Sequence, residues 1–162
     1  MRTELPGGHR RSIRLSGHDY ASSACYFVTL CTFRRRRLFG RIVDATVRLS
    51  SVGELVQQIW IATEGVRPGV VLDAFVIMPN HMHAIVILPH TPHVNSQSRR
   101  LPRSLGSLVA GFKTACTSRV NAMIGAKGIR IWQRNYHERV LRNGDALARA
   151  RRYIAANPAR GA

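Results

Sequence analysis

The first half of the chain contains apolar runs whose composition is typical of β-strands. Residues 24–33 (ACYFVTLCTF) are rich in β-branched and aromatic side chains and predict a first strand. Residues 70–78 are apolar except for Asp73 and predict a buried central strand, and residues 81–88 predict the strand that returns from it. The Pro-Asn dipeptide between these two runs is typical of a tight turn. The pair therefore predicts an antiparallel hairpin.

Two longer segments show the period of an amphipathic helix. Residues 49–64 and 104–123 both repeat apolar side chains at spacings of three and four positions. Ser50 or Ser51 is a candidate cap for the first of these helices, because a serine hydroxyl can accept from the free amides of the first turn. A loop rich in proline, serine and asparagine is expected between the hairpin and the second helix.

The C-terminal part of the chain predicts a strand and one more helix. Residues 129–141 are expected to form a short strand and then an irregular segment, and residues 146–157 a helix with Asn143 as its N-cap. The helix is expected to end by Pro158, because the residue before a proline avoids the helical region. The order strand-helix-strand-strand-helix-strand-helix predicts an α+β fold of ferredoxin-like (RRM-like) type. In this fold helices pack on an antiparallel sheet, and the last helix is an additional C-terminal element.

Composition indicates one basic domain. The chain has 162 residues, 25 lysines and arginines against 8 acidic residues, and a formal net charge of +17. Residues 1–22 show no periodicity and are expected to form a flexible basic arm, and residues 23–162 a single domain. A hydrophobic fraction of 45% argues against a disordered basic tail. A charge of this size favours nucleic acid as the partner, ahead of an anionic membrane.

The cellular compartment follows from absent signals. The first 20 residues contain no apolar core of a signal peptide, and no apolar run approaches the length of a membrane span. Cys25, Cys31 and Cys116 form no CxxC pair, so they are expected to be free thiols. We therefore expect a cytoplasmic, nucleoid-associated protein with no membrane partner.

His81 and His83 form the sharpest chemical motif. Side chains alternate along a strand, so both imidazoles are expected on one face, with Met82 turned to the opposite layer. Two imidazoles on one face can bind a divalent cation and leave room for oxygen ligands. By spacing alone, an alternative remains that both are hydrogen-bonded or solvated side chains near a turn.

Tyr153 and Asn157 form a second candidate pair. They lie four residues apart on the predicted last helix and therefore share one face. The tyrosine can act as a nucleophile and the asparagine oxygen as a metal ligand. The alternative is that Tyr153 packs on the core and that Asn157 caps the helix before Pro158.

Arginines dominate the positive charge and gather in three places. All but two of the 25 cations are arginines, whose guanidinium binds phosphate in a bidentate manner. The groups are Arg34, Arg35, Arg36 and Arg37; Arg99, Arg100 and Arg103; and Arg149, Arg151 and Arg152. Such groups can fix the register of a nucleic-acid backbone, or can form a merely solvated surface. Trp132 and Tyr136 can likewise stack on unpaired bases or belong to the core.

Taken together, these residues resemble the single-tyrosine HUH transposases, and most closely their REP-associated branch. Three ordered segments carry the resemblance: residues 75–83 (FVIMPNHMH), residues 104–113 (SLGSLVAGFK), and the C-terminal series WQRNY at 132–136, Arg142-Asn143 and YIAANP at 153–158. The resemblance as a whole extends over residues 24–158, nearly the whole predicted domain.

The resemblance implies a metal-dependent endonuclease and strand transferase acting on single-stranded DNA. His81, His83 and Asn157 would bind Mg²⁺ or Mn²⁺, and Tyr153 would attack a phosphate at or near a palindromic hairpin, giving a 5′-phosphotyrosine link. The protein would act as a monomer or homodimer. The residues expected to contact DNA are Arg34, Arg35, Arg36, Arg37, Lys113, Gln133, Arg134, Arg149 and Arg152.

Alternatives remain within this interpretation. Tyr136 is a rival nucleophile, but it lacks an asparagine or glutamine one turn later and matches no nucleophile position of the family. Many relatives continue well beyond the Asn-Pro motif, whereas this chain stops at Ala162, so a C-terminally shortened copy stays an open alternative. A catalytically inactive or domesticated hairpin-binding protein of the same fold is the main alternative. An RNA-binding module of the same fold would carry stacking aromatics where His81 and His83 stand.

Overall fold

A four-stranded antiparallel sheet forms the centre of the molecule. The computed structural model describes residues 24–89 and 104–160, and the predicted arm at residues 1–22 lies outside them. The strands follow the order β4-β5-β1-β6, with bounds β4 Val71–Met78, β5 His81–Leu88, β1 Ala24–Cys31 and β6 His137–Leu141. This is the strand order of the predicted ferredoxin-like fold, which is thereby confirmed.

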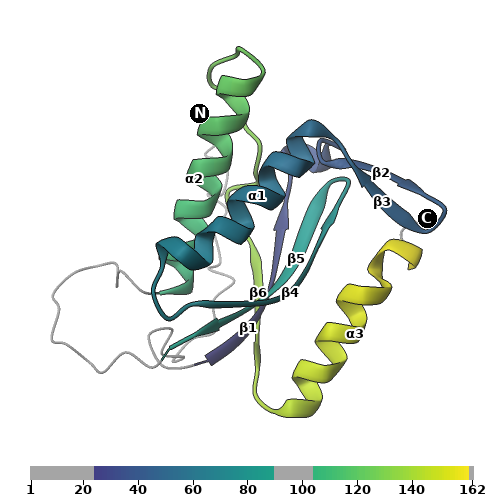
Figure 1. Cartoon of the computed structure of the whole chain (residues 1–162), viewed down its shortest axis with the longest axis vertical. Helices are drawn as coiled ribbons and strands as arrows, with labels where there is room; N and C mark the ends of the chain where they lie inside the picture. Colours follow the sequence, from purple (N-terminus) through teal and green to yellow (C-terminus); the bar gives the residue numbers. More distant parts are fainter. Residues whose placement is uncertain (1–23, 90–103, 161–162) are drawn as a thin grey trace, which may run out of the picture.

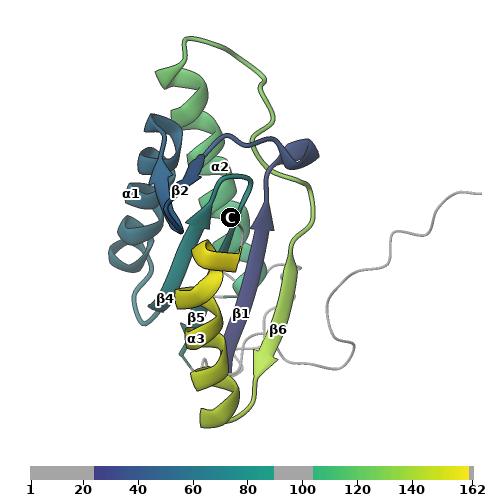
Figure 2. The same ribbon diagram turned by 90° about the vertical axis from the view of Figure 1, so that its right-hand side faces the viewer.

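Helices cover both faces of this sheet. Helices α1 (Ser51–Val66) and α2 (Leu105–Met123) lie on one face, and α3 (Gly144–Arg160) lies alone on the other, as Figures 1 and 2 show. The side of the sheet that faces α1 and α2 carries the larger apolar core, where Trp60 and Phe112 meet edge to face at 4.9 Å. The α3 side has a small cluster of four buried residues: Ile85, Leu141, Ala150 and Ile154. Helices α1 and α2 therefore contribute most of the apolar stabilisation, and α3 packs on the sheet through a smaller apolar interface.

Polar caps begin each helix, and those of α1 and α3 stand at positions that the sequence indicates. Ser50 accepts from the amide of Gly53, and Ser104 accepts from the amide of Ser107. Asn143 accepts from the amide of Ala146 at 2.8 Å. Each cap satisfies an amide that has no partner within the helix. Of the two candidate serines for α1, Ser50 is the cap.

Two predictions for the C-terminal part are wrong in detail. Within residues 129–141 the strand follows the irregular segment and does not precede it. Residues 131 and 132 are buried in the core without belonging to a strand, and β6 then pairs with β1. Helix α3 continues past Pro158 to Arg160. The proline removes one hydrogen bond near the helix end, where its cost is smaller than in a helix interior.

A short hairpin between β1 and α1 is absent from the sequence prediction. Strands β2 (Gly40–Val43) and β3 (Thr46–Leu49) form a separate two-stranded sheet. Before it, residues 33–35 form a 3-10 turn (η1, Phe33–Arg35), so the predicted arginine loop begins as a tight turn. Both strands of the hairpin contact β4, and β3 also contacts α3. This inserted element therefore lies beside the helix that carries Tyr153.

Candidate active site

The histidine pair lies at the start of β5, on the face of the sheet that α3 covers. The rings of His81 and His83 lie 4.8 Å apart, and Met82 between them is fully buried in the opposite core, as alternation predicts. In the register of the sheet, His81 faces Cys31 and His83 faces Thr29 of β1. The strand therefore presents both imidazoles side by side.

Each imidazole is oriented through its Nδ1 atom. His83 Nδ1 is hydrogen-bonded to Thr29 Oγ1 at 2.8 Å, and His81 Nδ1 lies 2.7 Å from Asn80 Oδ1. The carbonyl oxygen of an amide only accepts, so Nδ1 of His81 carries the hydrogen in this arrangement. The Nε2 atom of a neutral His81 then keeps its lone pair available for a ligand.

Helix α3 brings Tyr153 against this pair. The phenol ring lies 5.3 Å from the His83 ring, and Phe27 of β1 contacts both, at 5.2 Å from His83 and 5.8 Å from Tyr153. Ile154, the next residue, is buried in the small apolar cluster and anchors this turn of the helix. A tyrosine and a histidine separated by 70 positions in the sequence thus share one contact cluster.

Tyr153 and Asn157 differ in exposure. Tyr153 is 38% exposed, whereas Asn157, one helical turn later, is only 7% exposed. Asn157 is one of four buried polar side chains among the described residues. Burying an amide is costly unless its polar atoms find partners, so this position is a candidate for a polar role. The Arg160 guanidinium lies over the Tyr153 ring at 5.7 Å.

Both histidines are held neutral at physiological pH. Burial lowers the pKa of His83 to about 4, and the neighbouring His81 and the Arg35 guanidinium act in the same direction. Burial, and then the charge of Arg35, also lowers the pKa of His81. The neutral imidazole is the form that binds metals, so these shifts suit a ligand role.

The rival tyrosine is enclosed. The Tyr136 hydroxyl is inaccessible to solvent, its ring packs on the main core, and the Lys113 ammonium lies 5.7 Å above that ring. Trp132 is 7% exposed within the same core, so it belongs to the core and is not placed to stack on unpaired bases. A phosphate cannot approach a buried phenol oxygen, which leaves Tyr153 as the accessible candidate.

Lys113 contacts the main chain. Its ammonium donates to the carbonyl oxygens of Gln133 at 2.8 Å, Asn135 at 3.0 Å and Arg134 at 3.5 Å. Burial lowers the pKa of Lys113 to about 8. Lys113 thus fastens the segment before β6 to α2, and its expected contact with DNA stays a prediction.

The arginine turn is fixed beside the histidines. Thr32 donates its amide to the carbonyl of Asn80 at 3.0 Å, which ties the start of the turn to the residue before His81. Arg34 and Arg35 adopt left-handed backbone angles, with φ of 56° and 57°. Such angles are uncommon for residues with side chains and often mark functional sites. All four arginines of residues 34–37 are exposed, and Arg35 lies close enough to influence both imidazoles.

The remaining predicted DNA contacts that the structure describes lie on α3 and before β6. Arg149 and Arg152 are exposed on α3, and Arg134 is exposed before β6, where Gln133 is half-buried. The third arginine group, at residues 99, 100 and 103, lies outside the described residues. Every described member of the predicted set except Gln133 and Lys113 is therefore open to solvent.

Sequence reasoning missed the residues that support the histidines. Phe27 and Thr29 share the α3 face of β1, because side chains two positions apart point the same way. That periodicity is visible in the sequence, but the pairing of Thr29 with His83 depends on the register between two distant strands. No local signal specifies that register.

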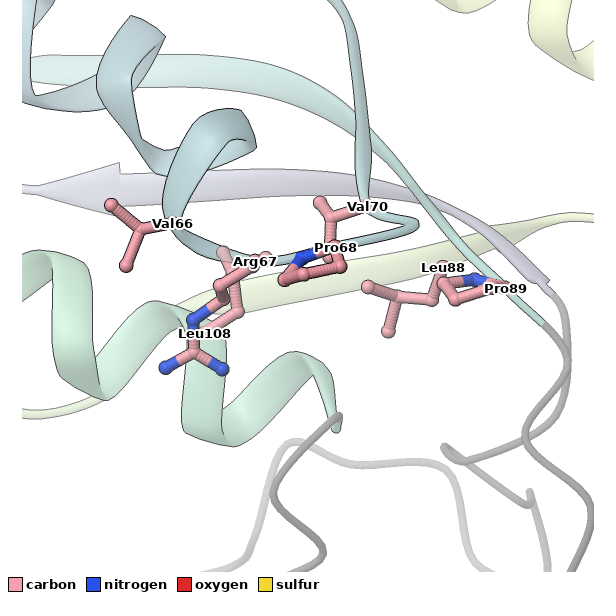
Figure 3. Close-up of a pocket in the computed structure, with 7 residues that line it drawn as sticks. All are labelled: Val66, Arg67, Pro68, Val70, Leu88, Pro89 and Leu108. Carbon is pink, nitrogen blue, oxygen red and sulfur yellow. The ribbon is translucent and has the colours of Figure 1, made fainter.

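A cavity elsewhere in the molecule is separate from this site. It has a volume of about 330 Å³, and Figure 3 shows its lining residues: Val66, Arg67, Pro68, Val70, Leu88, Pro89 and Leu108. Leu88 ends the strand that His81 begins, so about 23 Å of extended chain separates the two ends. The histidine site therefore does not belong to this cavity.

Two absences apply to the described residues. They contain no group of three or more histidine, cysteine or acidic side chains placed to hold a metal. No helix among them has the length and apolar character that crossing a bilayer requires.

Comparison with known proteins supplies a family and a fold. No protein-family model matches the chain. A Haemophilus influenzae protein, described as uncharacterized, is 35% identical over 173 positions, covering 98% of this chain and 94% of the relative. A solved REP-associated tyrosine transposase bound to a REP hairpin superposes with a TM-score of 0.64 at 22% identity, covering 91% of this chain and 74% of that one. The chain therefore belongs to the same family as the Haemophilus protein, and it has the fold of a REP-associated tyrosine transposase.

Proposed function

We propose that this protein is a metal-dependent transposase that cleaves and rejoins single-stranded DNA at or near hairpins, with Tyr153 as nucleophile. The observation that carries the proposal is the contact between the exposed Tyr153 ring and the neutral imidazole of His83, at 5.3 Å. Two features not used by the fold itself, a pair of neutral histidines and a solvent-accessible phenol, meet on one face of the sheet.

The residues present fit a divalent cation of the Mg²⁺ or Mn²⁺ type. His81 and His83 are neutral and oriented through Nδ1, which is how metal-binding histidines are held by neighbouring groups. The buried side-chain amide of Asn157 can supply an oxygen ligand. An oxygen ligand suits a hard cation better than a third imidazole does. When bound, the cation would withdraw charge from the phosphate under attack.

The proposed chemistry is a transesterification. The Tyr153 phenol oxygen attacks the phosphorus, a bond forms between that oxygen and phosphorus, and the bond from phosphorus to the 3′-oxygen breaks. The proton lost by the phenol is balanced by the proton gained on the released 3′-hydroxyl. The covalent 5′-phosphotyrosine stores the bond energy until a 3′-hydroxyl attacks it, so no nucleotide cofactor is required.

The surface charge supports a DNA substrate. The chain carries a net charge of +17, and the exposed arginines of residues 34–37 follow Thr32, whose amide is bonded to the carbonyl of Asn80 next to His81. Arginine guanidinium groups bind phosphate oxygens in a bidentate manner. The solved transposase of the same fold is bound to a REP hairpin, which supports a hairpin as the substrate class.

A denaturing-gel assay tests this function. The full chain would be mixed with a labelled single-stranded hairpin oligonucleotide from repeats flanking its gene, with Mn²⁺ and with or without chelator. We expect a protein-linked DNA band that requires metal, persists in Tyr136→Phe and disappears in Tyr153→Phe, while hairpin binding by Tyr153→Phe is unchanged. Binding without any covalent band would favour the inactive hairpin-binding protein. A band that survives in Tyr153→Phe would overturn the nucleophile.

A further inference from the structure

The β2–β3 hairpin places two arginines directly opposite each other. Arg41 of β2 pairs with Arg48 of β3 in the antiparallel register, and both side chains are exposed. The neighbouring pair, Ile42 and Val47, is half-buried on the other face. Side chains of a directly opposed pair have Cβ atoms about 5 Å apart, so the two guanidinium groups share one patch of surface.

This arrangement is unfavourable for the free protein. Like charges at directly opposed positions destabilise a strand pair, and a two-stranded ribbon has little stability to lose. The turn adds strain, because Asp44 and Ala45 both have positive φ, 49° and 56°, where glycine or asparagine is preferred. The hairpin therefore keeps a costly charge pair on a two-stranded sheet.

Within the described part of the chain no acidic group neutralises this pair. Asp44 lies in the same hairpin, yet it forms no ion pair with Arg41 or Arg48. The described ion pair of the molecule joins two other residues, Arg151 and Asp73. Both guanidinium groups are therefore available to an external anion.

The base of the hairpin is nevertheless firmly placed. Phe39 donates its amide to the carbonyl of Pro79, in the turn that precedes His81. At Gly40, a Cβ atom would lie 2.2 Å from the Arg48 carbonyl oxygen, so the strands are pressed together where they leave the core. In Figure 1 the hairpin extends toward the C-terminal end of α3, and β3 contacts that helix. The hairpin that carries the arginine pair thus contacts the helix that carries Tyr153.

We propose that the β2–β3 hairpin is a DNA-binding arm in which Arg41 and Arg48 each bind a backbone phosphate of the hairpin substrate. The inference rests on the proposed function, because it takes DNA hairpins as the substrate. Phosphate is the partner that fits, since a guanidinium fork matches its oxygens and two adjacent phosphates relieve the repulsion between the two arginines. Binding then restores the stability that the free arm gives up.

Two measurements on the full chain test the arm. The variants are Arg41→Thr, Arg48→Thr and the double variant, with Arg119→Ala on the exposed face of α2 as the control for loss of one distant positive charge. The first measurement is the salt dependence of affinity for the hairpin oligonucleotide. The second is the thermal midpoint of the free proteins. Threonine is chosen because it favours strands, so the backbone is preserved.

The expected results have opposite signs for the two measurements. Each single variant lowers the slope of log affinity against log salt by about 0.9, and the double variant by about 1.8, as loss of one and two phosphate contacts requires. In the absence of DNA, each single variant raises the thermal midpoint by up to about 4 °C, and the double variant adds little more. Arg119→Ala leaves both the slope and the midpoint near the wild-type values.

Two further DNA substrates locate the contact. If the arm binds the paired stem, the variants show the reduced salt slope with a blunt duplex of the same stem. If the arm binds the unpaired flanking strand, they show it with that strand. A wild-type protein that binds with a steep salt slope, together with an unchanged slope in the double variant, overturns the arm and leaves the proposed function standing. Absence of hairpin binding by the wild-type protein overturns both.

Discussion

Arg151 of α3 holds Asp73 of β4 through two nitrogen atoms. The guanidinium Nε lies 2.9 Å from Asp73 Oδ2 and Nη2 lies 2.8 Å from the same oxygen. This pair ties the helix that carries Tyr153 to the edge strand of the sheet, and the apolar cluster under that helix has only four buried members. The orientation of Tyr153 therefore depends partly on a polar contact.

Loss of this ion pair is expected to affect chemistry more than stability. Arg151→Ala should lower the free energy of unfolding by less than about 1 kcal/mol, because the arginine side chain is 52% exposed. Formation of the covalent DNA band should slow by about tenfold to a hundredfold, because a nucleophile that is misplaced by a small distance loses much of its rate. The charge-swapped double variant, Asp73→Arg with Arg151→Asp, should recover part of that rate. An equal rate in Arg151→Ala and wild type would contradict the positioning role.

Thr29 is expected to act through His83. Thr29→Val keeps the shape of the side chain and removes the hydrogen bond to Nδ1. The Mn²⁺ concentration needed for half-maximal adduct formation should rise by about tenfold to a hundredfold, the usual effect of losing a partner of a metal-binding histidine. Thr114→Val on α2, whose hydroxyl donates to a helical carbonyl, is the matched control and should not change that concentration. The same metal requirement in both variants would show that Thr29 does not orient the ligand.

Lys113 gives the fold a defined pH dependence. Its folded pKa, about 8, lies below its ordinary value of 10.5, so between these two values the unfolded chain binds more protons than the folded one. The free energy of unfolding of the wild type should therefore rise, relative to that of Lys113→Met, as the pH increases from about 8 to about 10.5. Urea unfolding at several pH values measures this difference. A difference that falls over the same range would show that the three carbonyl contacts stabilise the charged form more than burial disfavours it.

Two glycines of α1 should respond oppositely to alanine. A Cβ atom at Gly53 would lie 2.0 Å from the Phe39 carbonyl oxygen, whereas one at Gly65 would meet no atom within 4 Å. Gly65→Ala should raise the free energy of unfolding by about 0.5–1 kcal/mol through helix propensity alone. Gly53→Ala should lower it by more than about 1 kcal/mol, because the main chain at the base of the hairpin has to move. Chemical denaturation of the two variants measures both changes, and a gain for Gly53→Ala would mean that this contact yields easily.

Strongly periodic segments of the sequence predict their elements correctly, and segments defined by distant contacts do not. Strand β5 and the caps Ser50 and Asn143 follow from local rules of alternation and hydrogen bonding. The β2–β3 hairpin does not, because its turn residues, Asp44 and Ala45, lack the glycine that usually marks positive φ.

The candidate site divides in the same way. Tyr153 and the histidine pair are suggested by residue type, spacing and family resemblance. Their contact, however, is created by the packing of α3 on the sheet. Thr29 and Arg35 influence the histidines through the register of β1 and through a left-handed turn, neither of which is encoded in a short motif.

The arginine turn starts and finishes on neighbouring carbonyl groups. Thr32 donates its amide to Asn80, and Phe39 donates its amide to Pro79, each at 3.0 Å. The stretch between them therefore returns to the place from which it departed, and its length and composition can vary without displacing the strand that begins at His81. The fold thus contains a closed surface loop beside the candidate site, and changes within this loop can leave the position of the histidine strand unaltered.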